Sequence, residues 1–333
     1  MKVTRLSFMI ASTILLSSCS SGPVIKNHTK ETIDAGQMAI KQSSDFFDSL
    51  LILQNQHAAI IYATQPECVL NETNTIQIRA QNSGKSDLCA SEKEIKSGNS
   101  HLLELTPLDK RRFQTDMEIL QVFSDYLAAL TTYTDDPKTP VANLLDKALT
   151  NANSIKQLQS LTSDQKTAVT GLATYLEKMI REYEQGKSIS ELVLTEGLAQ
   201  QENIKNVEID IDRMNSLYKE SMMLADVNSL KNYYRNHINT TEFNSYKKRE
   251  EFISKIDTLS QDINYSVSSP VPASVAIKKF MTYHQNLINI INGDYSEKVK
   301  KEKIEIERKQ LIDGLKYVGE IVKPLVKSAI SFA

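Results

Sequence analysis

The stretch from Ser190 to Asn236 most constrains the fold, because it contains no strong helix breaker except Gly197. Apolar side chains recur through it at intervals of three and four residues: Ile204, Val207, Ile211, Met214, Tyr218, Met222 and Ala225. Residues spaced in this way lie on one face of an α-helix. A periodic stretch of this length predicts one extended, coiled-coil-like helix.

Helix breakers are scarce in the rest of the chain as well. The 333 residues include only 10 Gly and 8 Pro, and this scarcity favours helices joined by short connections. We expect seven or eight helices. Long helices joined by short turns predict an all-α fold, an elongated antiparallel helical bundle. Besides 190–236, we expect helices at about 31–64, 106–130, 139–161, 162–186, 242–265, 273–291 and 296–333.

Short motifs predict where several helices begin and end. Thr106-Pro107 and Thr139-Pro140 each place an N-cap residue before a Pro at the first helical position. Gly186 is expected to stop a helix. Residues 268–272, Ser-Ser-Pro-Val-Pro, form the clearest linker, so we divide the chain there into a main helical body (31–267) and a C-terminal helical pair (268–333).

The C-terminal pair carries strongly apolar faces. Its first helix has two stripes, and we expect it to pack on both sides: Ala276, Phe280, Tyr283, Leu287 and Ile290, then Ile277, Met281, Ile288 and Ile291. Its second helix has a seam in four-three alternation, with Pro324 predicting a kink: Leu311, Leu315, Val318, Val322, Leu325, Ala329 and Phe332. We expect the seam to join the core. The alternative is a docking helix for a partner or for the membrane surface.

The N-terminus has the order of a secretory signal peptide. Lys2 and Arg5 are basic, residues 6–16 are mostly apolar, and the chain turns polar after Leu16-Ser17-Ser18-Cys19. The apolar run is too short to remain as a transmembrane helix, which needs about 20 residues. A segment that is inserted and then cut is expected at 1–18.

Leu16-Ser17-Ser18-Cys19 resembles the lipobox of bacterial lipoprotein precursors. The resemblance implies that Cys19 receives a diacylglycerol, that cleavage follows Ser18, and that the new amino group is acylated. The membrane would then be a partner, held through the lipids on Cys19, and residues 19–30 would form a flexible tether. Ser20 hints at the outer membrane, because enteric-type lipoproteins retained at the inner membrane carry Asp there. An ordinary signal peptide with a chance Cys is the alternative.

After lipidation of Cys19, Cys68 and Cys89 would be the two remaining thiols. In an oxidising compartment such a pair is expected to form a disulfide, and closing a loop of about 22 residues contributes roughly 3 kcal/mol in the chain-entropy model. A metal site is the alternative, although His57 and His101 have no tight spacing to either Cys. We expect an irregular excursion at 66–100, with a strand-like run at 75–79 that belongs to a small hairpin.

Composition and motifs exclude several functional classes. Without Lys2 and Arg5, 37 basic residues face 41 acidic ones, and nucleic-acid binding would need a basic excess. No cofactor-binding, nucleophile-elbow or zinc-protease motif is present. None of His57, His101, His237 and His284 follows an acidic residue by three positions, as a di-metal bundle site requires. Asp210 and Asp212 fall on different helix faces, so we expect solvated charges and no catalytic pair.

A mixture of aromatic and basic residues surrounds the expected turn near Thr240. It comprises Tyr233, Tyr234, Arg235, His237, Tyr246, Lys247, Lys248 and Arg249. Such mixtures can bind a partner, such as a glycan or an acidic polymer. The competing interpretation is a helix–helix corner whose long side chains bury their stems and keep their charges in water.

These observations favour a lipid-anchored, mostly helical protein of the bacterial envelope, facing the periplasm or the cell exterior. We expect a binding, scaffold or accessory component of an envelope assembly with a protein partner, and no enzymatic activity. One alternative is a hydrolase or glycan-modifying enzyme whose site assembles only in three dimensions. A second is an immunity or exclusion lipoprotein that blocks a toxin or phage.

Overall fold

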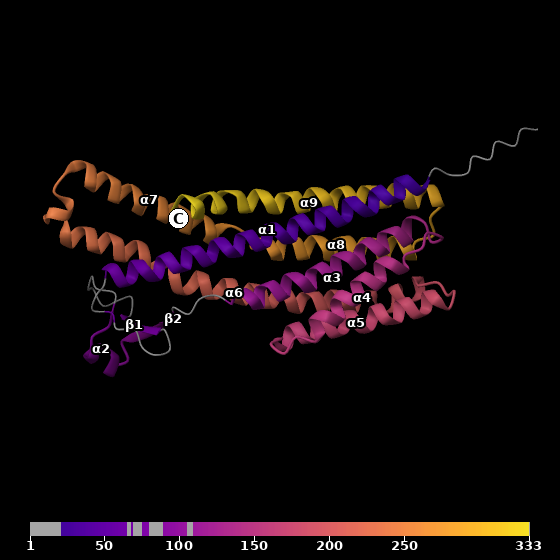
Figure 1. Cartoon of the computed structure of the whole chain (residues 1–333), viewed down its shortest axis with the longest axis horizontal. Helices are drawn as coiled ribbons and strands as arrows, with labels where there is room; N and C mark the ends of the chain where they lie inside the picture. The colour runs from indigo at the N-terminus through magenta and orange to yellow at the C-terminus, as the bar shows by residue number, and fades with distance from the viewer. Residues whose placement is uncertain (1–20, 65–67, 69–74, 80–88, 105–108, 333) are drawn as a thin grey trace, which may run out of the picture.

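The computed structural model describes residues 21–64, 68, 75–79, 89–104 and 109–332, and it confirms an all-α fold (Figure 1). The described residues contain one small sheet, of two strands. The elements are α1 (Ser21–Thr64), β1 (Thr75–Arg79), α2 (Glu92–Lys96), β2 (Ser100–Glu104), α3 (Lys110–Asp135), α4 (Ala142–Lys156), α5 (Ser163–Glu184), α6 (Ser190–His237), the 3-10 helix η1 (Thr241–Phe243), α7 (Tyr246–Ser268), α8 (Pro272–Asn292) and α9 (Glu297–Phe332).

The helices form an elongated bundle with two distinct ends (Figure 1). Helices α1 and α9 lie side by side, and both begin at the end where α3 turns into α4. The turn between α6 and α7 lies at the opposite end, beyond the last residues of α1. The two-stranded sheet lies towards that same end. The start of the described chain is therefore separated from the α6–α7 turn by the length of the bundle.

Helix α3 is the central helix, and it is buried on nearly every side from Phe113 to Asp135. It contacts α1, α4, α5, α6, α8 and α9. The sequence predicted a single apolar face, because the other faces carry Thr and Ser. Thr131, Thr132 and Thr134 satisfy their hydroxyls by donating to the carbonyls four residues earlier, at 2.7–2.9 Å. A threonine that does this presents mainly a methyl group, so α3 packs as an apolar helix.

The prediction of a flexible tether at 19–30 is wrong for residues 21–30, which belong to α1. The Thr29 hydroxyl lies 2.6 Å from that of Thr132 on α3. Glu31 forms an ion pair with Arg308 of α9, whose side chain is only 6 % exposed. These contacts attach the first turns of α1 to the bundle. Cys19 lies outside the described residues.

Two predicted helix starts are also wrong. Asp109 caps α3 by accepting from the Arg112 amide at 2.9 Å, while Thr106 lies outside the described residues. Helix α4 starts at Ala142, two residues later than Thr139-Pro140 predicted, because the Asp136 side chain holds Thr139 and Lys138 in a turn. The cap at Thr162 is confirmed as a reciprocal capping box with Gln165.

The predicted disulfide between Cys68 and Cys89 is confirmed. It staples an antiparallel hairpin in which Thr75 pairs with Glu104 and Arg79 with Ser100, so the excursion runs four residues beyond the expected boundary. Arg79 donates to the Glu94 carboxylate of α2 at 2.9 Å, and both side chains are largely buried. The hairpin thus has its own small set of stabilising contacts.

The C-terminal helices join the core, as predicted. Both stripes of α8 are covered, since Ala276, Ile277, Phe280, Tyr283, Leu287, Ile288 and Ile290 are buried. The α9 seam is buried from Leu311 to Val322 against α1 and α8. Pro324 lies within α9. The side chains of Leu325, Ala329 and Phe332 are not among those described.

Candidate functional site: the α6–α7 corner

The predicted aromatic and basic residues come together where α6 turns into α7. Helix α6 ends at His237, η1 spans Thr241–Phe243, and Ser245 caps α7 by accepting from the Lys248 amide at 3.3 Å. Thr240 bonds back to the His237 carbonyl at 2.7 Å. Short polar side chains thus close the turn, which we call the corner (residues 231–257).

Four aromatic rings pack together beneath the corner. The rings of Tyr234 and Phe252 stack with centroids 5.8 Å apart and an interplanar angle of 19°. Phe243, only 2 % exposed, meets both of them edge-on. Tyr233 stacks on His237 at 4.2 Å. The corner therefore has a local aromatic core.

Most of the predicted charges at the corner have partners within it. Arg249 donates to the Phe243 carbonyl at 2.8 Å, and Lys248 to the Thr241 carbonyl at 3.4 Å. Lys247 forms an ion pair with Glu251. The structure therefore agrees with the interpretation of these residues as a helix–helix corner with extended cationic side chains.

Two more of the predicted residues differ in their surroundings. The Tyr233 hydroxyl donates to Glu242 at 2.6 Å, and this hydrogen bond raises the pKa of the phenol. Tyr246 is 72 % exposed, and its hydroxyl makes a long contact, 3.5 Å, with Glu250. Tyr246 is thus the most open ring of the predicted set.

One side of the corner is hollowed into a groove of about 370 Å³, which we call the α6–α7 groove. Its lining residues are Lys231, Tyr234, Arg235, Ile238, Ile253, Ile256 and Asp257. Ile238 is 37 % exposed and Ile253 is 42 % exposed. The sequence prediction included Tyr234 and Arg235 but missed the other five. The spacing of Lys231, Arg235 and Ile238, four and three residues apart, is the signal that places them on one helix face.

A buried ionic cluster lies away from the corner, between α3, α5 and α6. Arg112 donates through Nε to Asp210 at 2.7 Å, and Gln165 donates to Asp116 at 2.9 Å. Asp210 is fully buried, so the prediction that it is a solvated charge is wrong. Its partner comes from a residue 98 positions earlier, which helix-face arithmetic cannot reveal.

Asp116 and Asp210 have different electrostatic surroundings within this cluster. Burial raises the pKa of Asp116 well above its usual value of 3.8, and the nearby Asp210 charge adds to the effect. The Arg112 guanidinium, whose pKa is raised by its hydrogen bond to Asp210, balances the Asp210 charge. The cluster therefore holds one ion pair and one protonated carboxyl near neutral pH.

A second polar cluster is sealed in the bundle core around His284 of α8. The Tyr126 hydroxyl lies 2.8 Å from Nε2 of His284 and 3.3 Å from the Tyr175 hydroxyl. Burial lowers the pKa of His284 from 6.5 to about 3. The imidazole is thus neutral at ordinary pH. No sequence motif marked this cluster, because its members come from three helices.

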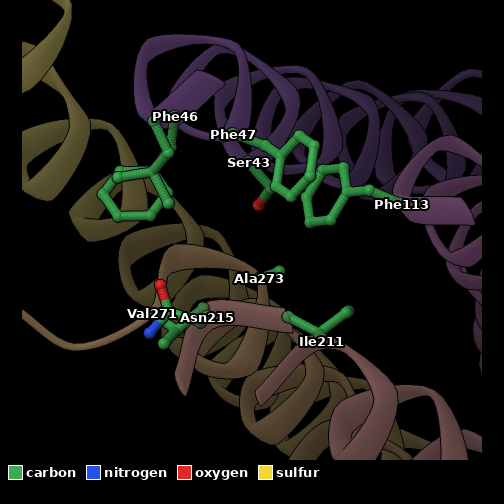
Figure 2. Close-up of a pocket in the computed structure, with 9 residues that line it drawn as sticks. Ser43, Phe46, Phe47, Phe113, Ile211, Asn215, Val271 and Ala273 are labelled. Carbon is green, nitrogen blue, oxygen red and sulfur yellow. The ribbon is translucent and has the colours of Figure 1, made fainter. Parts of the chain in front are cut away.

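These buried clusters lack the open space that substrate chemistry needs. None of their side chains lines the α6–α7 groove or the enclosed cavity drawn in Figure 2. That cavity, bordered by Phe46, Phe47 and Phe113, has a volume of about 10 Å³, which is room for at most one water. The stacked rings of Phe47 and Phe113, whose centroids are 4.0 Å apart, form one side of this cavity (Figure 2).

The described residues contain neither a membrane-spanning helix nor a cluster of metal ligands. No described helix has an apolar stretch suited to crossing a bilayer. Nowhere in the described ranges do three or more His, Cys, Asp or Glu side chains gather in a way that could hold a metal ion. The α6–α7 groove contains two of the residues predicted for partner binding, Tyr234 and Arg235, and we therefore take it as the candidate functional site.

Comparison of the chain with models of known protein families, with curated proteins and with solved structures finds no match.

Proposed function

We propose that this protein is a lipid-anchored component of the bacterial envelope that carries a partner-binding corner at the end of a helical bundle. The anchor would be the lipidated Cys19, two residues before α1 begins at Ser21. Two or three acyl chains on one residue suffice for stable membrane attachment. Ser20 favours the outer membrane as the site of attachment.

The main support for this proposal is that the start of α1 and the α6–α7 corner lie at opposite ends of the bundle (Figure 1). The lipobox directly precedes the start of α1, and the α6–α7 corner lies at the other end of the bundle (Figure 1). The 44 residues of α1 give a helix about 66 Å long, at a rise of about 1.5 Å per residue. A corner at that distance is suited to meeting a molecule away from the anchoring membrane.

A binding role agrees better with the buried clusters than a catalytic role does. The perturbed carboxyl and imidazole groups are enclosed in the core, where they link helices, and the open groove has no such group. Catalysis needs a reactive group within reach of a substrate. The bundle therefore supports a scaffold that presents a surface.

Fatty-acid labelling in cells tests the anchor. Wild-type protein should incorporate labelled palmitate and sediment with membranes, and Cys19→Ala should abolish both. Ser20→Asp is the matched variant for sorting, because it should keep the label and move the protein to the inner membrane on a density gradient. Continued labelling of Cys19→Ala, or absence of label from the wild type, would contradict the proposal.

A further inference from the structure

The α6–α7 groove carries two cations that lack a partner among the described side chains. Lys231 and Arg235 lie one helical turn apart on α6, and no described carboxylate pairs with either of them. The remaining predicted bases of the corner are engaged, since Lys247, Lys248 and Arg249 all have partners. The α6 wall therefore carries two positive charges against the single carboxylate among the lining residues, Asp257 of α7, on a chain that is acidic as a whole.

Between these cations and α7, the groove presents apolar surface to solvent. Ile238 and Ile253 are each about two-fifths exposed, and Ile256 beneath them is buried. Helix α7 is poorly covered for its length: among its described side chains, only Ile256 and Leu259 are fully buried. An amphipathic helix with an uncovered apolar strip can gain stability by packing against another helix.

We propose that the α6–α7 groove binds an acidic amphipathic helix of a protein partner. The partner's apolar residues would cover Ile238 and Ile253, and its carboxylates would pair with Lys231 and Arg235. Two antiparallel helices with an apolar strip between them accept a third helix in the usual bundle geometry. This inference deepens the proposed function, on which it rests, by naming the partner's chemistry.

Glycans and lipids fit the same groove less well. Sugar binding needs a free aromatic face. Tyr234, the aromatic residue that lines the groove, has one face stacked on Phe252, and the exposed Tyr246 is not among the lining residues. The anchoring membrane is at the opposite end of the bundle, about 66 Å away by the length of α1. Charge and apolar surface together therefore favour a carboxylate-bearing helix.

Site-specific photocrosslinking in intact cells tests the proposal on the full chain. A photoreactive amino acid replaces Ile253 in the groove or, as the control, Ile306, which is 53 % exposed on α9. The crosslinked peptide is then identified by mass spectrometry. We expect a Glu- or Asp-rich amphipathic segment captured from position 253 and not from position 306.

Charge reversal supplies the second arm of the test. Arg235→Glu should lower the yield of the adduct at least tenfold, whereas Lys247→Glu, which reverses an exposed charge outside the groove, should leave it unchanged. An adduct made only of lipid or glycan would overturn the proposal, and so would a segment without carboxylates, equal yields from positions 253 and 306, or insensitivity to Arg235→Glu. Palmitate labelling of the same samples reports the anchor independently, so loss of the label would identify a failure of the proposed function itself.

Discussion

The imidazole Nε2 of His284 lies 2.8 Å from the Tyr126 hydroxyl, and both side chains are fully buried. The amide nitrogen of Gln201 faces the other ring nitrogen, Nδ1, at 3.4 Å. Since an amide nitrogen only donates, Nδ1 accepts and Nε2 carries the proton. The hydrogen bonds thus fix one neutral tautomer and tie α8 to α3 and α6.

This neutral imidazole predicts a loss of stability in acid. The pKa of His284 is about 3 in the fold and about 6.5 in the unfolded chain. Below pH 6.5 the unfolded chain therefore binds a proton that the folded chain excludes, and the free energy of unfolding falls by up to roughly 1.4 kcal/mol per pH unit. His284→Gln should remove this slope, as measured by urea denaturation at pH 5 and pH 7.

Tyr126→Phe is the matched control, because it removes the same hydrogen bond and keeps the imidazole. It should lower stability by about 1 kcal/mol at both pH values and preserve the acid slope. Identical slopes in the His284→Gln variant and the wild type would contradict the assignment.

For Asp116 we expect the opposite pH dependence of stability: the free energy of unfolding should fall as the pH rises. Its pKa is raised in the fold, so above about pH 4 the unfolded chain releases a proton that the folded chain retains. The contribution of Asp116 to stability is therefore complete at low pH and is lost as the pH rises. Asp116→Asn resembles the protonated acid and keeps an acceptor for Gln165. Its stability relative to the wild type should rise from pH 4 to pH 8.

Variants of two other aspartates, Asp212 and Asp210, serve as comparisons for this measurement. Asp212→Asn is the control for replacing a carboxylate at an exposed position, where Asp212 accepts from Ser274 at 2.7 Å. Asp210→Asn should destabilise the protein by about 3 kcal/mol at neutral pH, because it leaves the partly buried Arg112 without its carboxylate. A flat difference between Asp116→Asn and the wild type would show that Asp116 is ionised in the fold.

Loss of the disulfide should loosen the hairpin and spare the bundle. Cys68 and Cys89 lie 21 positions apart, and the loop-entropy model gives the bond about 3 kcal/mol. The hairpin lies outside the bundle core, so Cys68→Ser with Cys89→Ser should accelerate hydrogen exchange at 75–104 and leave α3 protected. Rapid exchange in α3 of the double variant, or free thiols at Cys68 and Cys89 in the wild-type protein, would contradict this prediction.

Helix α1 lies very close to α3 at Gly36. A Cβ at this position would overlap the buried Ser124 hydroxyl and touch the Phe280 ring. Gly36→Ala should therefore destabilise the protein by about 1–3 kcal/mol, and Ser124→Ala should recover part of the loss. Gly314→Ala is the control, since its Cβ would meet only the flexible Lys279 side chain. Thermal melts of the three variants give the comparison, and equal effects at the two glycines would refute the close approach.

Local patterns in the sequence were sufficient to predict most of the helices. Helix α6 needed only its unbroken period, and α5 only the Thr162 cap and Gly186, which has a φ of 69°. The full burial of α3 could not be predicted in this way. Its threonines count as polar residues in the sequence, and only the structure shows that their hydroxyls donate to carbonyls within the helix.

The candidate site was only partly predictable for a related reason. Tyr234 and Arg235 stood out as members of an aromatic and basic mixture, whereas Ile253 and Asp257 join them only when α7 folds back on α6. The pairing of Arg112 with Asp210 spans 98 residues. Periodicity within one helix carries no information about which helix faces it.

The intact mass of the protein purified from membranes reports most directly on the lipid anchor at Cys19. We expect a chain that starts at Cys19 and carries a diacylglycerol and an acyl group. A chain that still begins at Met1, or one with an unmodified thiol at Cys19, would contradict this expectation.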